Sequence, residues 1–329
     1  MSIGILFIIF VLLLVIAIPV GIALGITSVL PSLADPSFTV GAKYMVRAMF
    51  GGLDSFPLLA VPMFVLSGII MAKGGISKKL FDVFAYFLGN RTAGMPCAVI
   101  VTCLFYGAIS GSAPATVAAV GSMTIPILTE LGYDLKFTTA IVAVAGGLGV
   151  IIPPSIPFIM YGMASGASVS DLFIAGIIPG LLIGILLMVY AFHYCRKHGE
   201  DKLRIRTEVQ KLHDRSLVTV LKDSFFAILS PVIILGCIYS GVASPTEAAV
   251  ISVFYALIIS LLVYKSIHLK DLGEIFKEAI RTFTPILFIL AASTAFSRVL
   301  TLMQVPQTVS ELISSNFHSK IIILFIINA

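Results

Sequence analysis

Two short runs of serine, glycine and proline interrupt the longest uncharged stretches of this chain. Residues 110–114 (Ser-Gly-Ser-Ala-Pro) break the run 92–129, and residues 146–155 (GGLGVIIPPS) break the run 137–170. Backbone inside a bilayer must pair its N–H and C=O groups, so unwound backbone there faces protein, water or a bound solute. Secondary transporters build their ion and substrate sites from broken helices of this kind. The two breaks therefore predict a carrier.

The composition requires that these breaks lie in a membrane. The 329 residues are 59% hydrophobic and 11% charged, with a mean hydropathy of +1.10, whereas soluble domains carry about a quarter charged residues. This length allows roughly 8 to 10 crossings of about 20 residues each. The basic residues fall in loops, where membrane topology explains them, so the net charge of +5 does not indicate a nucleic-acid partner. The fold class expected is an all-α polytopic membrane protein.

Charge sets the predicted topology. The stretch 193–223 holds eight Lys and Arg residues, which the positive-inside rule places in the cytoplasm. Counting outward from it puts the N-terminus in the cytoplasm, provided that 94–131 doubles back at its break. Its halves, of about 16 residues, leave open whether it is re-entrant or spans fully. The predicted apolar segments are 3–33, 53–75, 94–131, 137–166, 169–195, 224–242, 246–264, 282–303 and 321–329.

A weak internal repeat suggests how these segments are organised. Phe56-Pro57-Leu58-Leu59 resembles Thr284-Pro285-Ile286-Leu287, 228 residues later and in the opposite predicted orientation. We expect a first inverted repeat at 1–195, with a hairpin at 94–131 and a broken helix at 137–166. A cytoplasmic basic linker (196–223) and an incomplete second repeat (224–329) follow. The counterpart of the first break would fall near position 338, so we expect a truncated chain.

Three motifs in order along the chain resemble the large membrane subunit of TRAP (tripartite ATP-independent periplasmic) transporters, which is called DctM-like. They are GAISGSAPATVAAVG at 107–121, GVIIPPSIP at 149–157 and GVASPTEAA at 241–249. The resemblance implies an elevator-type, sodium-driven importer of organic-acid anions in the bacterial inner membrane. It also implies two partners, a small four-helix membrane subunit and a periplasmic substrate-binding protein. C4-dicarboxylates, sialic acid and sugar-derived keto acids all suit the family. No cofactor is expected besides sodium as coupling ion.

On that pattern, sodium would lie between the two breaks. Sodium needs several hard oxygen ligands, which unwound carbonyls and serine hydroxyls supply, and the C-terminal end of the half-helix before the first break points its negative dipole at a cation. The candidate sodium ligands are Ser110, Gly111, Ser112, Pro114, Ile152, Pro153 and Ser155. The alternative is that these small residues only allow helices to pack closely.

An anionic substrate would lie beside the ion. The half-helices that start near Ala115 and Ile156 would offer free N–H groups to a carboxylate. The candidate substrate residues are Ser112, Thr116, Ser155 and Arg298. Arg298 is the one basic residue well inside an apolar segment, where it could bind a carboxylate in a bidentate pair. Snorkelling of its side chain to the interface is an equal alternative.

Three other functions compete with a carrier. An ion channel could use the polar breaks as a pore lining, although no segment repeats as a filter would. A membrane enzyme would need a general base, and the central apolar runs hold no His, Asp or Glu near their serines. A non-transporting remnant would follow from the expected truncation. We therefore expect a transporter subunit and no enzyme.

Overall fold

The computed structural model describes residues 3–34, 41–316, 319 and 322–325, and the regular elements in these ranges are all helical. The all-α prediction is therefore confirmed for this part of the chain. Contacts divide the chain into two compact units. Unit 1 comprises Met1–Ser55 and Thr284–Ala329, and unit 2 comprises Phe56–Phe283. These units do not test the predicted inverted repeat, whose expected continuation beyond 325 lies outside the described residues.

Five helices of the described chain are long and apolar enough to cross a membrane: Phe56–Lys73, Val169–His198, Leu217–Tyr239, Pro245–Val263 and Leu269–Leu302. Several shorter apolar helices accompany them, among them Gly94–Ser110 and Ile156–Ser165. This set agrees with a multi-pass membrane protein. Three of the helices next to the predicted breaks, Gly94–Ser110, Leu135–Val150 and Ile156–Ser165, fall in the shorter class because each one stops at a break rather than at a membrane surface.

The prediction of one continuous first helix at 3–33 is wrong. The structure has two helices, α1 (Ile3–Val15) and α2 (Val20–Ala34), joined by a turn in which Ala17 adopts a φ of 64°. Pro19 explains the interruption because proline lacks an N–H and disfavours helical backbone at the residue before it. The sequence carried that signal, but a hydropathy profile does not detect it.

Several helices continue beyond the apolar segments that predicted them. α12 (Leu217–Tyr239) begins before 224, and α14 (Leu272–Leu302) begins ten residues before 282. Pro285 therefore lies inside α14, and the segment predicted at 282–303 does not open this helix. Hydropathy marks where a helix enters lipid, whereas charged residues with good helix propensity can extend it into the interface.

The basic segment 196–223 is mostly helical. α10 (Val169–His198) runs into it, α11 (Lys202–His213) fills its middle and α12 begins within it. A further amphipathic helix, α5 (Ile76–Leu88), follows α4 (Ala60–Lys73) and buries Ile76, Leu80 and Phe81 on one face. Neither α5 nor α11 is apolar enough to span, so both suit a membrane surface.

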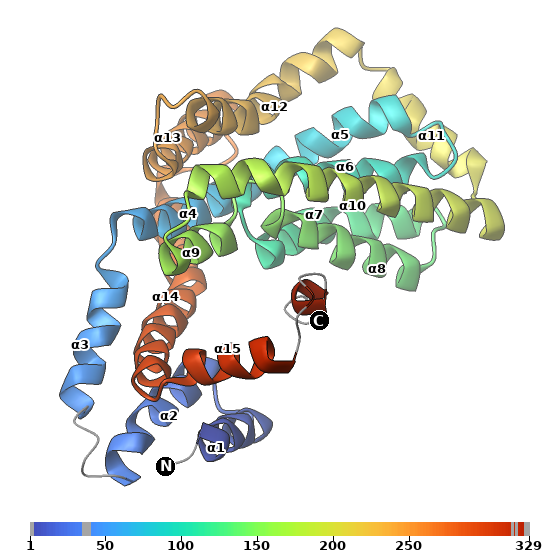
Figure 1. Cartoon of the computed structure of the whole chain (residues 1–329). Coiled ribbons are helices and arrows are strands. Elements are labelled where there is room, and N and C mark those ends of the chain that lie inside the picture. The colour runs from blue at the N-terminus through green and yellow to red at the C-terminus, as the bar shows by residue number, and fades with distance from the viewer. Residues whose placement is uncertain (1–2, 35–40, 317–318, 320–321, 326–329) are drawn as a thin grey trace. The chain divides into compact units, whose positions relative to one another are not determined.

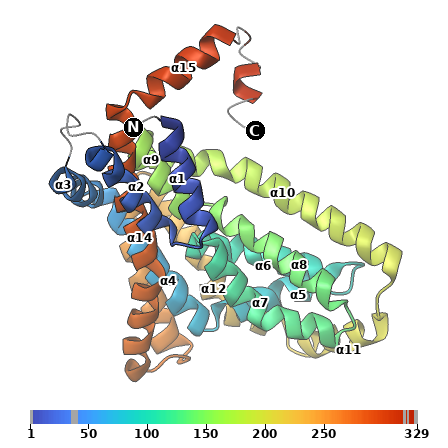
Figure 2. The same cartoon turned by 90° about the horizontal axis from the view of Figure 1, so that it is seen from below.

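Unit 2 is built around α6 (Gly94–Ser110), the first half of the predicted hairpin. Fourteen of its 17 residues are buried, so this helix contacts protein and not lipid. α7 (Ala113–Glu130) returns beside it, and α4, α5, α8 (Leu135–Gly146), α10 and α12 also pack on it. Figure 1 and Figure 2 show α6 and α7 lying beside α8 and α10. α13 (Pro245–Ile258) packs along α4.

Unit 1 packs α1, α2 and α3 (Ala42–Leu53) against the part of α14 from Thr284 onward; it also includes α15 (Val305–Asn316). Leu6, Leu24, Ala292 and Phe296 form one apolar cluster, and the rings of Phe10 and Phe296 stack with centroids 5.7 Å apart. A second cluster joins Met45 of α3 to Ala295 and Val299.

A single carboxylate holds together the base of the hairpin in unit 2. Glu200, after α10, accepts hydrogen bonds from the Ala93 N–H at 3.0 and 3.1 Å and from the Tyr133 hydroxyl at 2.5 Å. Ala93 precedes α6 and Tyr133 follows α7, so both ends of the hairpin meet at Glu200. Burial, followed by the hydrogen bond to Glu200, raises the pKa of Tyr133.

We expect Glu200→Ala to lower the free energy of unfolding by about 2–3 kcal/mol, because hydrogen bonds to a charged group each contribute about 1.5–3 kcal/mol. Thermal unfolding of the purified chain in detergent measures this change. Asp214→Ala removes the same charge from an exposed residue of the same region and should have little effect. Equal losses in the two variants would contradict a specific role for Glu200.

Candidate functional site

The first break separates α6 from α7 at the tip of the hairpin. Gly111 adopts a φ of +61°, the left-handed conformation that favours glycine, and Ser112 is extended. The Ser110 hydroxyl lies 2.9 Å from the Thr116 hydroxyl, and the latter donates to the Ser112 carbonyl at 2.9 Å. Ser110 and Thr116 are fully buried. The tip is therefore a polar turn in which the Ser110 and Thr116 side chains are buried, whereas Ser112 is partly exposed and Pro114 is exposed.

The second break interrupts the predicted broken helix. α8 passes into a short 3₁₀ helix, η2 (Gly147–Val150), and α9 (Ile156–Ser165) begins after residues 151–155. The Pro153–Pro154 peptide bond is cis. The buried Ser155 hydroxyl donates to the Val150 carbonyl at 2.7 Å and accepts from the Phe158 N–H at 3.4 Å, so it caps α9. Ser155 thus has a structural role that the spacing of residues did not reveal.

The two breaks contact each other directly through backbone. The N–H of Ile156 donates to the Gly111 carbonyl at 3.2 Å. A Cβ atom added to Gly111 would lie 2.8 Å from the Pro154 carbonyl oxygen, closer than real Cβ contacts allow. Gly111, which supplies the left-handed turn of the hairpin, therefore also supplies the space that the second break occupies.

Further glycines bring the helices beside the breaks into close contact. A Cβ on Gly107 would lie 2.6 Å from the Cα of Gly149, and a Cβ on Gly149 would lie 2.4 Å from the Thr116 hydroxyl oxygen. The backbone of α6 therefore touches the backbone of η2. These two glycines thus allow the close helix packing that the alternative interpretation describes. The packing brings the two breaks together and does not exclude a site between them.

The carbonyl groups at both breaks have few partners. Among the described residues, no hydrogen bond reaches the carbonyls of residues 108–110 at the end of α6 or those of residues 151–154. Ala108, Ile109, Ser110 and Ile152 are nevertheless almost inaccessible to solvent. Buried carbonyls in proteins normally pair with a donor, a water or an ion. These carbonyl oxygens are therefore candidate ligands for a hard cation, to which α6 adds the negative end of its dipole. The Pro154 oxygen lies against Gly111 of the hairpin tip, whereas the Ile151 oxygen lies against Gly176 of α10.

Free donors gather at the start of α7. Ala113 and Ala115 have N–H groups that donate no hydrogen bond within the described structure, and Pro114 has none to donate. Ser112 occupies the N-cap position, but its hydroxyl does not cap the helix and is partly exposed. At α9 the Ile156 and Phe158 N–H groups are already used. An anion would therefore find its free donors at α7 rather than at α9.

Arg298 belongs to unit 1, in α14. Its exposed side chain lines a cavity of about 500 Å³ together with Tyr44, Arg47 and Thr294. Gly52 permits this geometry, because a Cβ there would lie 2.5 Å from the Thr294 hydroxyl oxygen. The proposed contact of Arg298 with substrate stays a prediction, as does the alternative that it snorkels.

The family match and the similar proteins found for this chain all point to the same class of transporter. Residues 7–329 match the family described as tripartite ATP-independent periplasmic transporter, DctM component. The chain is 39% identical to the isethionate TRAP transporter permease protein DctMQ of Oleidesulfovibrio alaskensis, over 97% of this chain and 49% of that protein.

Two further relatives are TRAP large permease proteins. The C4-dicarboxylate protein DctM of Pseudomonas aeruginosa is 35% identical over 85% of this chain and 64% of its own length. The sialic acid protein SiaM of Vibrio cholerae is 33% identical over 94% of this chain and 71% of its own length. The chain thus spans about half to roughly 70% of the length of these three relatives. All three are permeases rather than enzymes.

Proposed function

The chain belongs to the DctM component family of tripartite ATP-independent periplasmic transporters. We propose that it imports organic anions across the membrane and that a sodium gradient drives this import. It would do so as the large membrane subunit of a three-part system. The resemblance found in the sequence motifs and the family match agree on this class. The coupling ion, the substrate class and the elevator motion of the hairpin are parts of the proposal.

One observation carries the sodium site. Two largely buried sets of carbonyls that accept no hydrogen bond among the described residues, at residues 108–110 and 151–154, lie at breaks joined by the bond from Ile156 to Gly111. Sodium would take its ligands from these carbonyls and from the hydroxyl of Ser112. Ser155 would contribute by fixing the shape of the second break. Movement of either break would change the ligand set, and this would couple ion binding to the conformation of the hairpin.

The substrate would bind at the start of α7. The Ala113 and Ala115 N–H groups and the Ser112 hydroxyl offer hydrogen bonds to an oxyanion. The Thr116 hydroxyl stabilises the turn through its hydrogen bonds with the Ser110 hydroxyl and the Ser112 carbonyl. The names of three relatives specify isethionate, C4-dicarboxylate and sialic acid, and each of these compounds bears an acidic group. We therefore propose an organic acid as substrate. Arg298, in unit 1, stays a separate candidate for binding a carboxylate.

The proposed partners are a small four-helix membrane subunit and a periplasmic substrate-binding protein, in the bacterial inner membrane. The N-terminus would lie in the cytoplasm. Uptake of radiolabelled malate, succinate, sialic acid and isethionate into proteoliposomes tests the proposal. The vesicles would hold the chain with its small subunit, with the binding protein outside and sodium replaced by potassium in the control. Saturable uptake that requires sodium and the binding protein supports it, whereas unsaturable flux without sodium coupling indicates a channel.

We expect Ser112→Ala to weaken sodium binding by about tenfold, corresponding to about 1.4 kcal/mol for one lost ligand. The substituted side chain caps nothing, so the fold should survive. Sodium-dependent thermal stabilisation of the purified chain measures the affinity without any transport. Ser122→Ala, on an exposed position of the same helix, is the matched control. An unchanged sodium affinity in Ser112→Ala would remove this residue from the site.

A further inference from the structure

A separate cavity lies in unit 2, away from both breaks. It has a volume of about 650 Å³ and lies between α5 and α11. Met95 of α6 and Ile127 of α7 line it from the hairpin, and Tyr264 lines it from the end of η3 (Ile259–Val263), a π-helical turn. The predicted topology places these helix ends at the cytoplasmic surface of the membrane.

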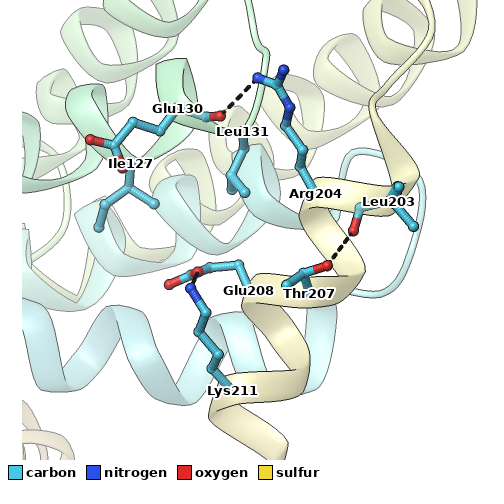
Figure 3. Close-up of a pocket in the computed structure, with 8 residues that line it drawn as sticks. All are labelled: Ile127, Glu130, Leu131, Leu203, Arg204, Thr207, Glu208 and Lys211. Atoms are coloured by element: carbon cyan, nitrogen blue, oxygen red, sulfur yellow. Dashed lines mark hydrogen bonds and ion pairs between the residues drawn. The ribbon is translucent and has the colours of Figure 1, made fainter.

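Cationic side chains dominate the charge of this cavity. Lys78 and Lys79 of α5 line it, as do Lys211 of α11 and Arg215 just after that helix. The Lys211 ammonium pairs with Glu208 at 2.7 Å, and Figure 3 shows the two side chains directed toward each other along α11.

The remaining cations form no ion pair among the described residues. The Lys79 ammonium lies 4.3 Å from the centre of the Tyr264 ring, and within the described chain Lys78 and Arg215 form no ion pair. Lys78, Lys79 and Arg215 therefore present positive charge to the cavity without a paired carboxylate.

Asp82 is the second acidic group in the cavity. Burial raises the pKa of its carboxyl group above the ordinary 3.8, against the lowering effect of Lys78, Arg215 and Lys79. The carboxylate is thus poorly solvated and opposes only part of the positive charge around it. An anion that enters the cavity would meet an excess of cations even when Asp82 is ionised.

The rest of the lining is apolar. Phe81, Met95, Ile127 and Leu212 line the cavity; Ile127 and Leu212 are half-buried and supply most of the accessible apolar surface, whereas Phe81 and Met95 are almost fully buried. A small soluble anion would use the cations but leave this apolar surface wet, whereas a lipid would cover it with its glycerol backbone and the first part of its chains. Basic pockets between helices on the cytoplasmic side are a known form of lipid-headgroup site.

We propose that this cavity binds the phosphate headgroup of an anionic phospholipid. The phosphate would lie among Lys78, Lys79 and Arg215, and the acyl chains would pass along the half-buried Ile127 and Leu212. Such a lipid would join α5 to α11 at the base of the hairpin, close to α7, where the Arg204 guanidinium donates to the Glu130 carbonyl at 3.3 Å (Figure 3).

Equilibrium titration of the purified chain in uncharged detergent, with bound lipid counted by native mass spectrometry, tests the proposal. The probes are phosphatidylglycerol, zwitterionic phosphatidylcholine and soluble glycerol phosphate. We expect phosphatidylglycerol to bind at least about tenfold more tightly than the other two. Equal affinity for phosphatidylcholine would overturn the role of charge, and equal affinity for glycerol phosphate would overturn the lipid assignment.

The double variant Lys78→Gln/Arg215→Gln should lower the affinity for phosphatidylglycerol by about tenfold or more, since each cation near a lipid phosphate contributes about fivefold. The control Lys197→Gln/Lys202→Gln removes the same charge from exposed residues outside the cavity. It should change the affinity for phosphatidylglycerol by less than about twofold. Equal losses in both would indicate general surface charge and overturn the site. The assay needs no sodium, substrate or partner, so its outcome is independent of the transport proposal.

Asp82→Asn gives a test in the opposite direction. Removing the carboxylate should strengthen binding of phosphatidylglycerol at neutral pH, a gain that damage to the fold would not produce. The wild-type chain binds the Asp82 proton more tightly when folded, so its stability should fall as the pH rises from 3.8 through the raised pKa. The variant should therefore be more stable than wild type at pH 7 and not at pH 3. Weaker lipid binding in Asp82→Asn would contradict the proposed arrangement of charges.

Discussion

Gly107→Ala is expected to abolish sodium-dependent uptake and to destabilise unit 2. Alanine in a helix ordinarily stabilises a protein by about 1 kcal/mol relative to glycine. The new contact of the Cβ therefore decides whether Gly107→Ala stabilises or destabilises the protein. The new Cβ would lie 2.6 Å from the Cα of Gly149, and backbone cannot rotate away as a side chain can. Overpacking costs about 1–3 kcal/mol, and we expect the upper part of that range. The strain would be relieved by separating α6 from η2, which also separates the two breaks.

The measurements for Gly107→Ala are thermal unfolding in detergent, sodium affinity and uptake. Gly147→Ala is the matched control, because Gly147 has helical backbone and a Cβ there meets nothing within 4 Å. This control should be as stable as wild type or slightly more stable. If Gly107→Ala folds normally and binds sodium with unchanged affinity, close contact between the hairpin and η2 is not needed for the ion site.

The positions of both breaks could be predicted from sequence because their cause is local. Glycine and proline at 111–114 and 153–154 prevent a regular helix whatever surrounds them. The contact between the breaks could not be predicted, because the bond from Ile156 to Gly111 joins residues 45 positions apart. The roles of Ser155 as a cap and of Glu200 as a clamp depend equally on neighbours that the spacing of residues does not specify.

Hydropathy located the membrane segments but not the helices. It missed the turn before Pro19, which depends on one residue, and it missed α5 and α11, which are too amphipathic to stand out from the loops around them. The charge pattern of Lys78 and Asp82 gave no sign of a cavity, because α11 completes that cavity from more than 120 residues away. The sequence alone could therefore indicate the class of protein and the positions of the two breaks better than the cavity between α5 and α11.

Gly111→Ala is expected to lose sodium binding more completely than any single hydroxyl deletion. Two costs combine at this position. Alanine in the left-handed conformation costs about 1–2 kcal/mol, and its Cβ would lie 2.8 Å from the Pro154 carbonyl oxygen. Pro154 would have to move, and the unpaired carbonyls of 151–154 would move with it. We expect sodium affinity to fall by about a hundredfold, which corresponds to about 2.7 kcal/mol.

Gly166→Ala separates these two costs. Gly166 ends α9 with a φ of +75°, so alanine there carries the same conformational strain, but a Cβ at Gly166 meets no atom within 4 Å. Both variants should therefore lose similar stability from backbone strain, while only Gly111→Ala should lose sodium affinity. Sodium-dependent thermal shifts of the two proteins provide the comparison. Equal sodium affinity in both would mean that the ion does not lie between the breaks, and that the unpaired carbonyls of residues 151–154 serve another ligand.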